Sequence, residues 1–210
     1  METSREQIRE MHRDSVRLAF MRAAEKLIAE RGFEKTSVHD IAKATGYSAG
    51  AFYQFFQSKE QMYEELVSHH CGELIRRLRE SRAVHERPMD QFRAAIKALA
   101  AYFNENRDFF RIYYMLTPGW DLSRKDSGSS ARRMLEEFLV EIEGMYEKGR
   151  ATGDFRADIP ARLMVQFAHG VISSLLLHWS SRSDGAAVPT PAEQERILVE
   201  LILGGIGRRA

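Results

Sequence analysis

The sequence predicts an all-α protein with a small N-terminal domain and a larger C-terminal domain. Apolar residues recur at helical spacing in one segment after another along the 210 residues. Glycine or proline separates these segments, as at Gly46 and at Pro118-Gly119. No segment alternates apolar and polar residues as a half-buried strand would, and no internal repeat is visible. We therefore expect helices only, divided between residues 1–58 and residues 59–210.

The chain opens with a charged extension, residues 1–14, in which arginines recur every four residues. We favour a solvated or frayed helix there over a basic arm that touches nucleic acid. Residues 120–130 and 180–191 have the composition of exposed loops. The helices expected after the extension cover residues 15–31, 36–45, 48–56, 59–84, 88–104, 106–117, 130–150, 160–179 and 192–206.

The stretch from Thr36 to Lys59 has the pattern of two short helices joined by a tight turn. Ser37 and Asp40 have the spacing of a capping box at the start of the first helix, with Asp in place of the usual Glu or Gln. Gly46 interrupts the apolar stripe, and Ser48 can cap a second helix. The second helix carries three apolar anchors, Phe52, Phe55 and Phe56. The stretch therefore predicts a helix-turn-helix.

The second helix of this motif presents small or uncharged side chains, so it can enter a major groove about 12 Å wide. Gly50 within an exposed helix costs about 1 kcal/mol relative to Ala, which suggests that a DNA backbone or another helix approaches it closely. We expect Tyr53 and Lys59 to contact phosphates, and Gln54 to read adenine. The candidate DNA-binding residues are Thr36, Ser37, Tyr47, Ser48, Ala49, Gly50, Ala51, Tyr53, Gln54 and Lys59.

The segment RGFEKTSVHDIAKATGYSAGAFYQFFQSKEQMY resembles the DNA-binding region of the TetR family of bacterial regulators. Matching positions are Arg31-Gly32-Phe33, Thr36, Ile41-Ala42, Gly46, Ser48, Gly50, Tyr53, Phe56 and Ser58-Lys59-Glu60. Ala49 departs from the Lys or Arg that is common in the family, and Phe55 from the usual His or Tyr. The resemblance implies a ligand-responsive transcriptional regulator, generally a repressor, but it transfers no sequence preference. The residues do not distinguish a repressor from an activator.

Composition neither supports nor excludes nucleic acid, because the formal net charge is only +1. Residues 1–59 hold ten Lys or Arg and eight Asp or Glu, so affinity for DNA would depend on a few well-placed cations, doubled by dimerisation. The single cysteine, Cys71, fits a reducing cytoplasm. The charged N-terminus does not resemble a signal peptide, and no segment is apolar enough to span a membrane. We therefore expect a cytoplasmic protein.

The helix expected over residues 160–179 is apolar nearly all round, which indicates burial on two faces. One face fits the core of the subunit. The other fits a partner, and the last helix, residues 192–206, would complete a four-helix interface in a homodimer. An entirely intrachain core is the alternative. A dimer would place two recognition helices about 34 Å apart, the spacing of half-sites in a palindromic operator.

Aromatic and methionine side chains are frequent between residues 99 and 179. For most of them a plain core explains the pattern. The resemblance also implies an apolar effector cavity in this domain, for a small lipophilic or aromatic ligand. The candidate ligand-binding residues are Phe103, Phe110, Tyr113, Tyr114, Trp120, Met134, Phe138, Phe167, His169 and His178. A ligand that tilted the helix starting at Lys59 would change the spacing of the two recognition helices and release the operator.

The alternatives to a DNA-binding regulator are an enzyme and a ligand-binding or scaffolding protein. The sequence contains no nucleophile elbow, phosphate-binding loop or HExxH motif, so we expect no enzyme, no catalytic residue and no cofactor. His69, His70 and Cys71 are adjacent on a helix and point in different directions, so we expect no metal site. A redox role for Cys71 lacks a resolving cysteine. The remaining alternative is an all-helical ligand-binding or scaffolding protein whose helix-turn-helix is vestigial.

Overall fold

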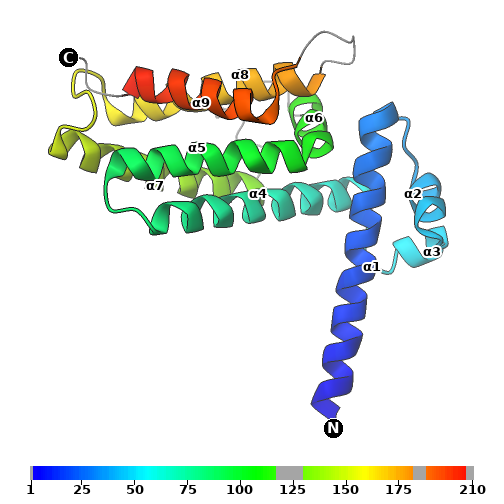
Figure 1. The fold of residues 1–210 in the computed structure, drawn as a ribbon. Helices are drawn as coiled ribbons and strands as arrows, with labels where there is room; N and C mark the ends of the chain where they lie inside the picture. The colour runs from blue at the N-terminus through cyan, green and yellow to red at the C-terminus, as the bar shows by residue number, and fades with distance from the viewer. Residues whose placement is uncertain (1, 117–129, 182–187, 207–210) are drawn as a thin grey trace. The chain divides into compact units, whose positions relative to one another are not determined.

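The structure is a computed structural model that describes residues 2–116, 130–181 and 188–206 (Figure 1). Within these residues the chain is helical and has no strand, as expected. The expected loops of the C-terminal domain fall largely on residues 117–129 and 182–187, which lie outside the described residues. The helices are α1 (Glu2–Arg31), α2 (Val38–Thr45), α3 (Ala49–Phe52), α4 (Lys59–Ala83), α5 (Pro88–Glu105), α6 (Arg107–Leu116), α7 (Ser130–Thr152), α8 (Ala161–Ser181) and α9 (Pro191–Ile206).

The chain forms two compact units that divide two of its helices between them. Unit 1 comprises the described residues through Ser68 together with the end of α6 from Ile112. Unit 2 comprises the remaining described residues, beginning at His69. The first turns of α4 therefore belong to unit 1 and its later turns to unit 2. The sequence alone suggested a boundary between residues 58 and 59, before this helix.

Helix α1 supplies one wall of the core of unit 1. Its inner face carries Phe20, Ala24 and Ile28, all buried. Together with α2, α3 and the start of α4 it encloses an apolar core. Gly32, with φ +86°, ends the helix, and its amide donates to the carbonyl of Ile28 at 2.8 Å. A left-handed φ suits glycine, because other residues meet a steric penalty there.

The charged extension is the first part of the same helix, because α1 runs without a break from Glu2 to Arg31. The side chains of residues 5–15 are all exposed. The apolar positions of this part, Ile8 and Met11, are exposed as well. From residue 5 the extension is thus an exposed helix with no packing partner among the described residues, and the preference for a solvated helix over an arm that touches DNA stays a prediction.

Unit 2 is a helical bundle in which α5 packs along α9 and against α7, while α8 contacts both α7 and α9 (Figure 1). Two aromatic groups fill parts of its interior. Phe92, Tyr146 and Phe155 form one, with the rings of Tyr146 and Phe155 stacked at 5.0 Å. Phe103, Phe110 and Trp179 form the other. Large apolar side chains therefore stabilise the bundle through burial from several helices at once.

Helix α9 begins with a capping box that the sequence analysis did not single out. The hydroxyl oxygen of Thr190 accepts a hydrogen bond from the amide of Glu193 at 3.3 Å. The Glu193 carboxylate in turn accepts from the amide of Thr190 at 2.7 Å. These bonds satisfy two amides at the helix start, and the hydrogen bonds that the Thr190 amide and hydroxyl donate to the carboxylate lower the pKa of Glu193. Among the described residues, no helix is both long and apolar enough to cross a membrane.

Candidate nucleic-acid interface and effector region

Helix α2 starts with the expected capping box. The Ser37 hydroxyl oxygen accepts from the amide of Asp40 at 3.1 Å, and the Asp40 carboxylate accepts from the amide of Ser37 at 3.1 Å. Hydrogen bonds from Ser37, that of its hydroxyl first and that of its amide second, hold the pKa of Asp40 below its ordinary value. The cap fixes the residue at which the chain enters the helix, and with it the direction of α2.

The turn between α2 and α3 is made by Gly46 and Ser48, as expected. Gly46 adopts φ +76° and donates its amide to the carbonyls at the end of α2. The amide of Tyr47 donates back to the carbonyl of Ala42 at 3.0 Å, which completes a Schellman-type end. Ser48 then caps α3, because its hydroxyl oxygen accepts from the amide of Ala51 at 3.1 Å. The helix-turn-helix geometry is therefore set by local hydrogen bonds.

An aromatic cluster anchors the turn to α1. The ring of Phe20 lies 5.5 Å from those of Tyr47 and Phe52, and 5.8 Å from that of Phe55. Phe52 is fully buried, although α3 spans only four residues. A helix so short depends on its tertiary anchors. The three expected phenylalanine anchors all contribute to this core, since Phe52 and Phe56 are buried and Phe55 is half-buried against it.

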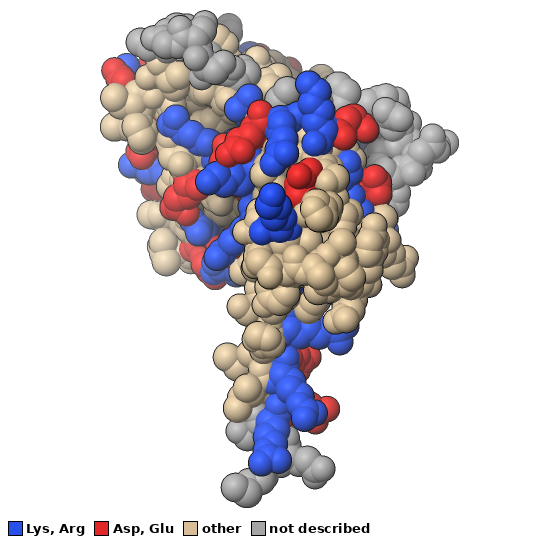
Figure 2. Space-filling view, turned by 90° about the vertical axis from the view of Figure 1, so that its right-hand side faces the viewer, with Lys and Arg blue, Asp and Glu red and all other residues tan. Residues whose placement is uncertain are grey.

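The outer face of α3 and the turn after it carries exposed, uncharged side chains. Ser48, Gly50 and Gln54 are exposed, and Tyr53 is 57% exposed. A Cβ on Gly50 would meet only the Ser48 hydroxyl, at 3.7 Å, so no neighbour within the described chain requires glycine there. Figure 2 shows a broad area without charged side chains on this side of the molecule. This face is open to another macromolecule and carries no charge of its own.

Two predicted contact residues have internal roles instead. Thr36 is fully buried, and its hydroxyl donates to the carbonyl of Gly32 at 2.8 Å. The Lys59 ammonium donates to the carbonyls of Phe33 at 2.7 Å and Thr36 at 3.0 Å, and it lies 4.1 Å above the Phe33 ring centre. Lys59 thus closes the loop between α1 and α2, and Thr36 has no surface for a phosphate contact. The sequence could not reveal either role, because both depend on the folded loop.

The other candidates differ in how far they reach the surface. Ser37 is exposed, but its hydroxyl is engaged in the hydrogen bonds that cap α2. Tyr47 is 40% exposed, and its ring packs against that of Phe20. Ala49 is half-buried, and Ala51 is half-buried against the core. The exposed face that remains consists of Ser48, Ala49, Gly50, Tyr53 and Gln54. Their roles in binding stay predictions.

Two cations that the sequence analysis did not single out are available beside this face. Lys35 lies in the loop before α2, and Lys43 lies in its last turn. Both side chains are exposed, and neither forms an ion pair within the described residues. Their positions on the polar side of the motif were a signal that could have identified them. They supply the positive charge that the predicted set lacks once Lys59 is occupied.

Three of the effector candidates, Phe103, Phe110 and Phe138, are buried in unit 2. Phe103 lies 5.3 Å from Phe110, and Trp179 lies 6.3 Å from Phe103 between ring centres. Phe138 is buried in a separate cluster, and Met134 is half-buried against it. The structure therefore brings Phe103 and Phe110 together, but it places Phe138 and Met134 elsewhere in the bundle.

The remaining effector candidates are scattered. Phe167 and His178 of α8 are exposed. His169 is half-buried, and burial lowers its pKa to about 4. Tyr113 belongs to unit 1. Trp120 and the side chain of Tyr114 lie outside the described residues. A ligand site built from the complete predicted set thus stays a prediction.

Helices α8 and α9 carry an exposed apolar stripe. Leu163 is 54% exposed, Phe167 47% and Leu177 39%, and Leu201 of α9 is exposed to a similar degree. Gly170 and Ser174, at helical spacing between them, are exposed as well. The Phe167 ring lies against Gly205 of α9, where a Cβ would meet it at 2.8 Å. Exposed apolar side chains in a continuous stripe are typical of a protein–protein interface.

Within the described residues, no three His, Cys, Asp or Glu side chains lie close enough together to hold a metal ion. One ring nitrogen of His70 is occupied by a tyrosine, since Nδ1 lies 2.8 Å from the hydroxyl of Tyr102. Its ring also stacks on that of Phe109 at 3.9 Å. His70 therefore acts as part of a buried polar and aromatic cluster in unit 2.

Residues 20–66 match the model of the family described as bacterial regulatory proteins, tetR family. The chain is 28% identical over 194 residues to the HTH-type transcriptional repressor KstR2 of Rhodococcus jostii, covering 87% of each protein. It is similar to the structure of the ketosteroid transcriptional regulator KstR2 of Mycobacterium tuberculosis, with a TM-score of 0.74 and 22% identity over 92% of this chain and 95% of that chain. It is also similar to FadR of Bacillus subtilis in complex with stearoyl-CoA, with a TM-score of 0.70 and 21% identity over 90% of this chain and 98% of that chain.

Proposed function

The chain belongs to the tetR family of bacterial regulatory proteins, and we propose that it represses transcription as a homodimer that a small, largely apolar effector releases from a palindromic operator. The observation that carries the proposal is the helix-turn-helix itself. Ser37, Gly46 and Ser48 fix its geometry through backbone hydrogen bonds, and the outer face of α3 remains open. A face of this kind suits the major groove of DNA.

Base readout would depend on Gln54, whose amide can make a bidentate contact with adenine. Ser48 can bond to either kind of base, and the methyl of Ala49 can contact thymine. Tyr53 would hold a phosphate through its hydroxyl. Lys35 and Lys43 would neutralise phosphates, because both are exposed.

So few cations per subunit favour a dimer, since two weak half-site contacts add in free energy. The exposed stripe formed by Leu163, Phe167, Leu177 and Leu201 supports an interface through α8 and α9. Burying a side chain of this size stabilises an interface by roughly 1.5 to 3 kcal/mol. Two copies joined in this way would present their recognition helices to successive half-sites of a palindrome.

The effector class is supported by the apolar interior of unit 2 and by the printed descriptions of two similar structures. One is a ketosteroid regulator, and the other was solved with stearoyl-CoA. Both descriptions name a compound with a large apolar part, a steroid skeleton in one and a stearoyl chain in the other. The group formed by Phe103, Phe110 and Trp179 is the aromatic part of unit 2 that best suits such a ligand.

The test is selection of bound fragments from random duplex DNA by the purified full chain, at low and moderate salt. We expect a palindromic motif whose enrichment falls steeply as salt rises. Gln54→Ala should relax the preference at one position of each half-site, and Gln57→Ala, an exposed glutamine outside α3, should leave the motif unchanged. An unchanged motif with Gln54→Ala would show that the readout assignment is wrong.

A second function follows from the uncharged face of α3, namely a ligand-binding or scaffolding protein whose helix-turn-helix no longer binds DNA. Salt dependence separates the two, because binding through phosphates must weaken with added salt. Absence of any enriched sequence, both before and after unfolding and refolding to strip a co-purified ligand, would favour the second function.

A further inference from the structure

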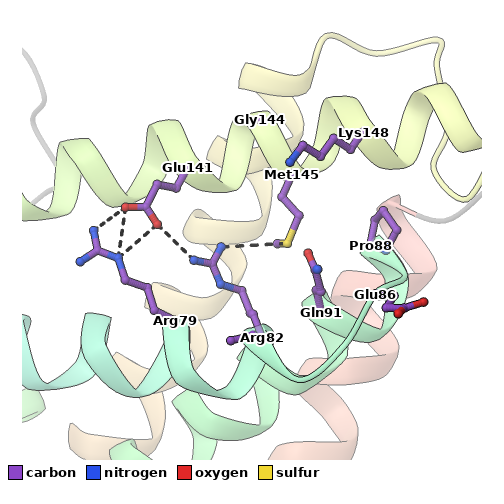
Figure 3. A pocket seen from close by; sticks show the side chains of 10 residues that line it. Arg79, Arg82, Glu86, Pro88, Gln91, Glu141, Gly144, Met145 and Lys148 are labelled. Carbon is purple, nitrogen blue, oxygen red and sulfur yellow. Dashed lines mark hydrogen bonds and ion pairs between the residues drawn. The ribbon is translucent and has the colours of Figure 1, made fainter.

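A pocket of about 470 Å³ lies within unit 2, at the end of α4, and it is lined by none of the predicted effector residues. Its walls come from the last turns of α4, the first turn of α5 and the middle of α7 (Figure 3). Pockets of roughly 300 to 1,000 Å³ hold small organic molecules in proteins. Its size therefore fits a ligand rather than a single ion.

Two guanidinium groups in this pocket share one carboxylate. Arg79 Nε lies 3.1 Å from Glu141 Oε1, and the Arg79 Nη2 group also pairs with this carboxylate. Arg82 Nη2 lies 3.1 Å from Glu141 Oε2. These hydrogen bonds, that from Arg79 first, lower the pKa of Glu141. One carboxylate cannot saturate two guanidinium groups, which carry five N–H donors each.

Of the two arginines, Arg82 is the one whose hydrogen-bond donors are not all satisfied. Its side chain is only 13% exposed, because it packs over the ring of Phe138 at 5.3 Å. Its Nη1 group reaches only the sulfur of Met145, at 4.0 Å. Its Nε is buried and has no hydrogen-bond partner among the described residues. Because Nε has almost no accessible surface, the donors of Arg82 that can still accept an oxygen atom from outside the chain are those of Nη1, whose weak sulfur contact does not satisfy them.

Further positive groups line the same pocket. Lys148 of α7 extends its ammonium along the helix toward Met145 (Figure 3) and forms no ion pair within the described residues. The first turn of α5 contributes Pro88, and Arg87, which precedes it, makes no side-chain cap. The start of a helix carries partial positive charge. The lining thus holds three cations and two carboxylates, and Glu86 directs its carboxylate away from the two arginines in Figure 3.

The rest of the lining is apolar. Met145 is buried beside Arg82, and Ala83 and Pro88 add further carbon surface. An inorganic ion would leave this surface unused. A molecule with one anionic head and a short apolar body would use both the donors and the carbon surface.

We propose that this pocket is a second ligand site, which takes a small organic anion, with its carboxylate or phosphate oxygens on Arg82 Nη1 and the Lys148 ammonium and its apolar part against Met145. Glu141 stays paired with Arg79 through Nε and Nη2 of that arginine. All of its lining groups belong to unit 2.

The test is isothermal titration calorimetry of the full chain with hexanoate, hexyl phosphate and hexanamide, the last being neutral but of similar length. We expect one of the two anions to bind and hexanamide to bind at least about tenfold more weakly. The preferred anion identifies the head group as carboxylate or phosphate. Arg82→Gln and Lys148→Gln should each weaken that binding, Arg82→Gln by about tenfold or more.

The control is Arg76→Gln, on the same helix, because Arg76 pairs with Glu73 and Glu80 on the exposed surface. It should change the affinity less than about twofold. Lys148 is exposed, so Lys148→Gln should fold normally. Its anion affinity therefore tests the site even if the Arg82 variant is unstable. The proposal is overturned if neither anion binds, if hexanamide binds as well as the anions, or if the Lys148 and Arg82 variants both bind like the original chain.

Discussion

The ammonium of Lys59 donates to the carbonyl oxygen of Phe33 at 2.7 Å, across 26 residues of sequence. The same ammonium reaches the carbonyl of Thr36 and lies above the Phe33 ring. The first residue of α4 therefore holds the loop that leads into α2. A residue that the sequence motif assigns to phosphate binding has a structural role in unit 1.

Lys59→Met should lower the free energy of unfolding by about 1 to 3 kcal/mol, because two carbonyls lose a charged donor. Its effect on DNA affinity should be the same at every salt concentration. Lys43→Met should instead leave stability unchanged and reduce the salt dependence of binding by about one phosphate. Denaturant unfolding and salt-series binding measure both quantities. A reduced salt dependence for Lys59→Met at full stability would restore the phosphate assignment.

Gly149→Ala should destabilise the protein by about 1 to 3 kcal/mol, because the new Cβ would stand 2.1 Å from the Phe155 ring. Phe155 cannot move easily, since it is buried and stacked on Tyr146. Gly144→Ala, on the same helix with nothing within 4 Å, should stabilise by up to about 1 kcal/mol. Thermal unfolding compares the pair, and equal effects would contradict this account of α7.

Stability should fall as the pH is lowered from about 6.5 toward 4, in part through His169. Burial lowers the pKa of His169 to about 4 from 6.5, so in this window the unfolded chain binds a proton that the folded chain does not. The free energy of unfolding therefore falls across this window, by at most about 3 kcal/mol. Urea unfolding at pH 7.5 and pH 5 should show a smaller difference for His169→Gln than for the original chain. An identical difference would contradict the prediction.

Cys71 should react slowly with thiol reagents in the folded protein. Burial raises its pKa to about 11, so the thiolate is scarce at pH 8. Relative to an ordinary thiol with a pKa of 9.0, the reaction with a disulfide reagent should be slower by on the order of 100-fold. The rate at which Cys71 reacts with the same reagent in the chain unfolded by urea gives the reference. Rapid labelling of the folded chain would revive a redox role.

Phe167→Asp should shift the proposed dimer toward monomer, because a carboxylate replaces a half-exposed ring in the apolar stripe of α8. Val140→Asp, at an exposed apolar position of α7, should leave the association state unchanged. Sedimentation equilibrium over a range of concentrations distinguishes the two. Loss of association in both variants, or in neither, would place the interface elsewhere.

The helices and their caps could be predicted because their signals are local. Ser37 with Asp40, Gly46 and Ser48 lie within a few residues of the bonds they make. The predicted ends of α4, α5 and α9 lie within one residue of the observed ends for the same reason. Pro88 and Pro191 begin α5 and α9, and the hydroxyl of Ser58 caps the start of α4.

The interior roles could not be predicted, because they depend on contacts between distant segments. The occupied ammonium of Lys59 and the burial of Thr36 require the folded loop between α1 and α2. The buried Nε of Arg82 requires α7 to pack beside the end of α4. Periodicity likewise identified Phe138 and Phe103 as apolar without showing that they fill separate clusters.

The sharing of α4 between the two units limits how the recognition unit can be isolated. Met62 and Leu66 are fully buried in the core of unit 1, and so is Ile112 of α6. A fragment cut at residue 58 would lose all three side chains and would expose Phe20 and Phe52 to water. A working DNA-binding module must therefore be transplanted together with at least the first ten residues of α4 and a substitute for Ile112.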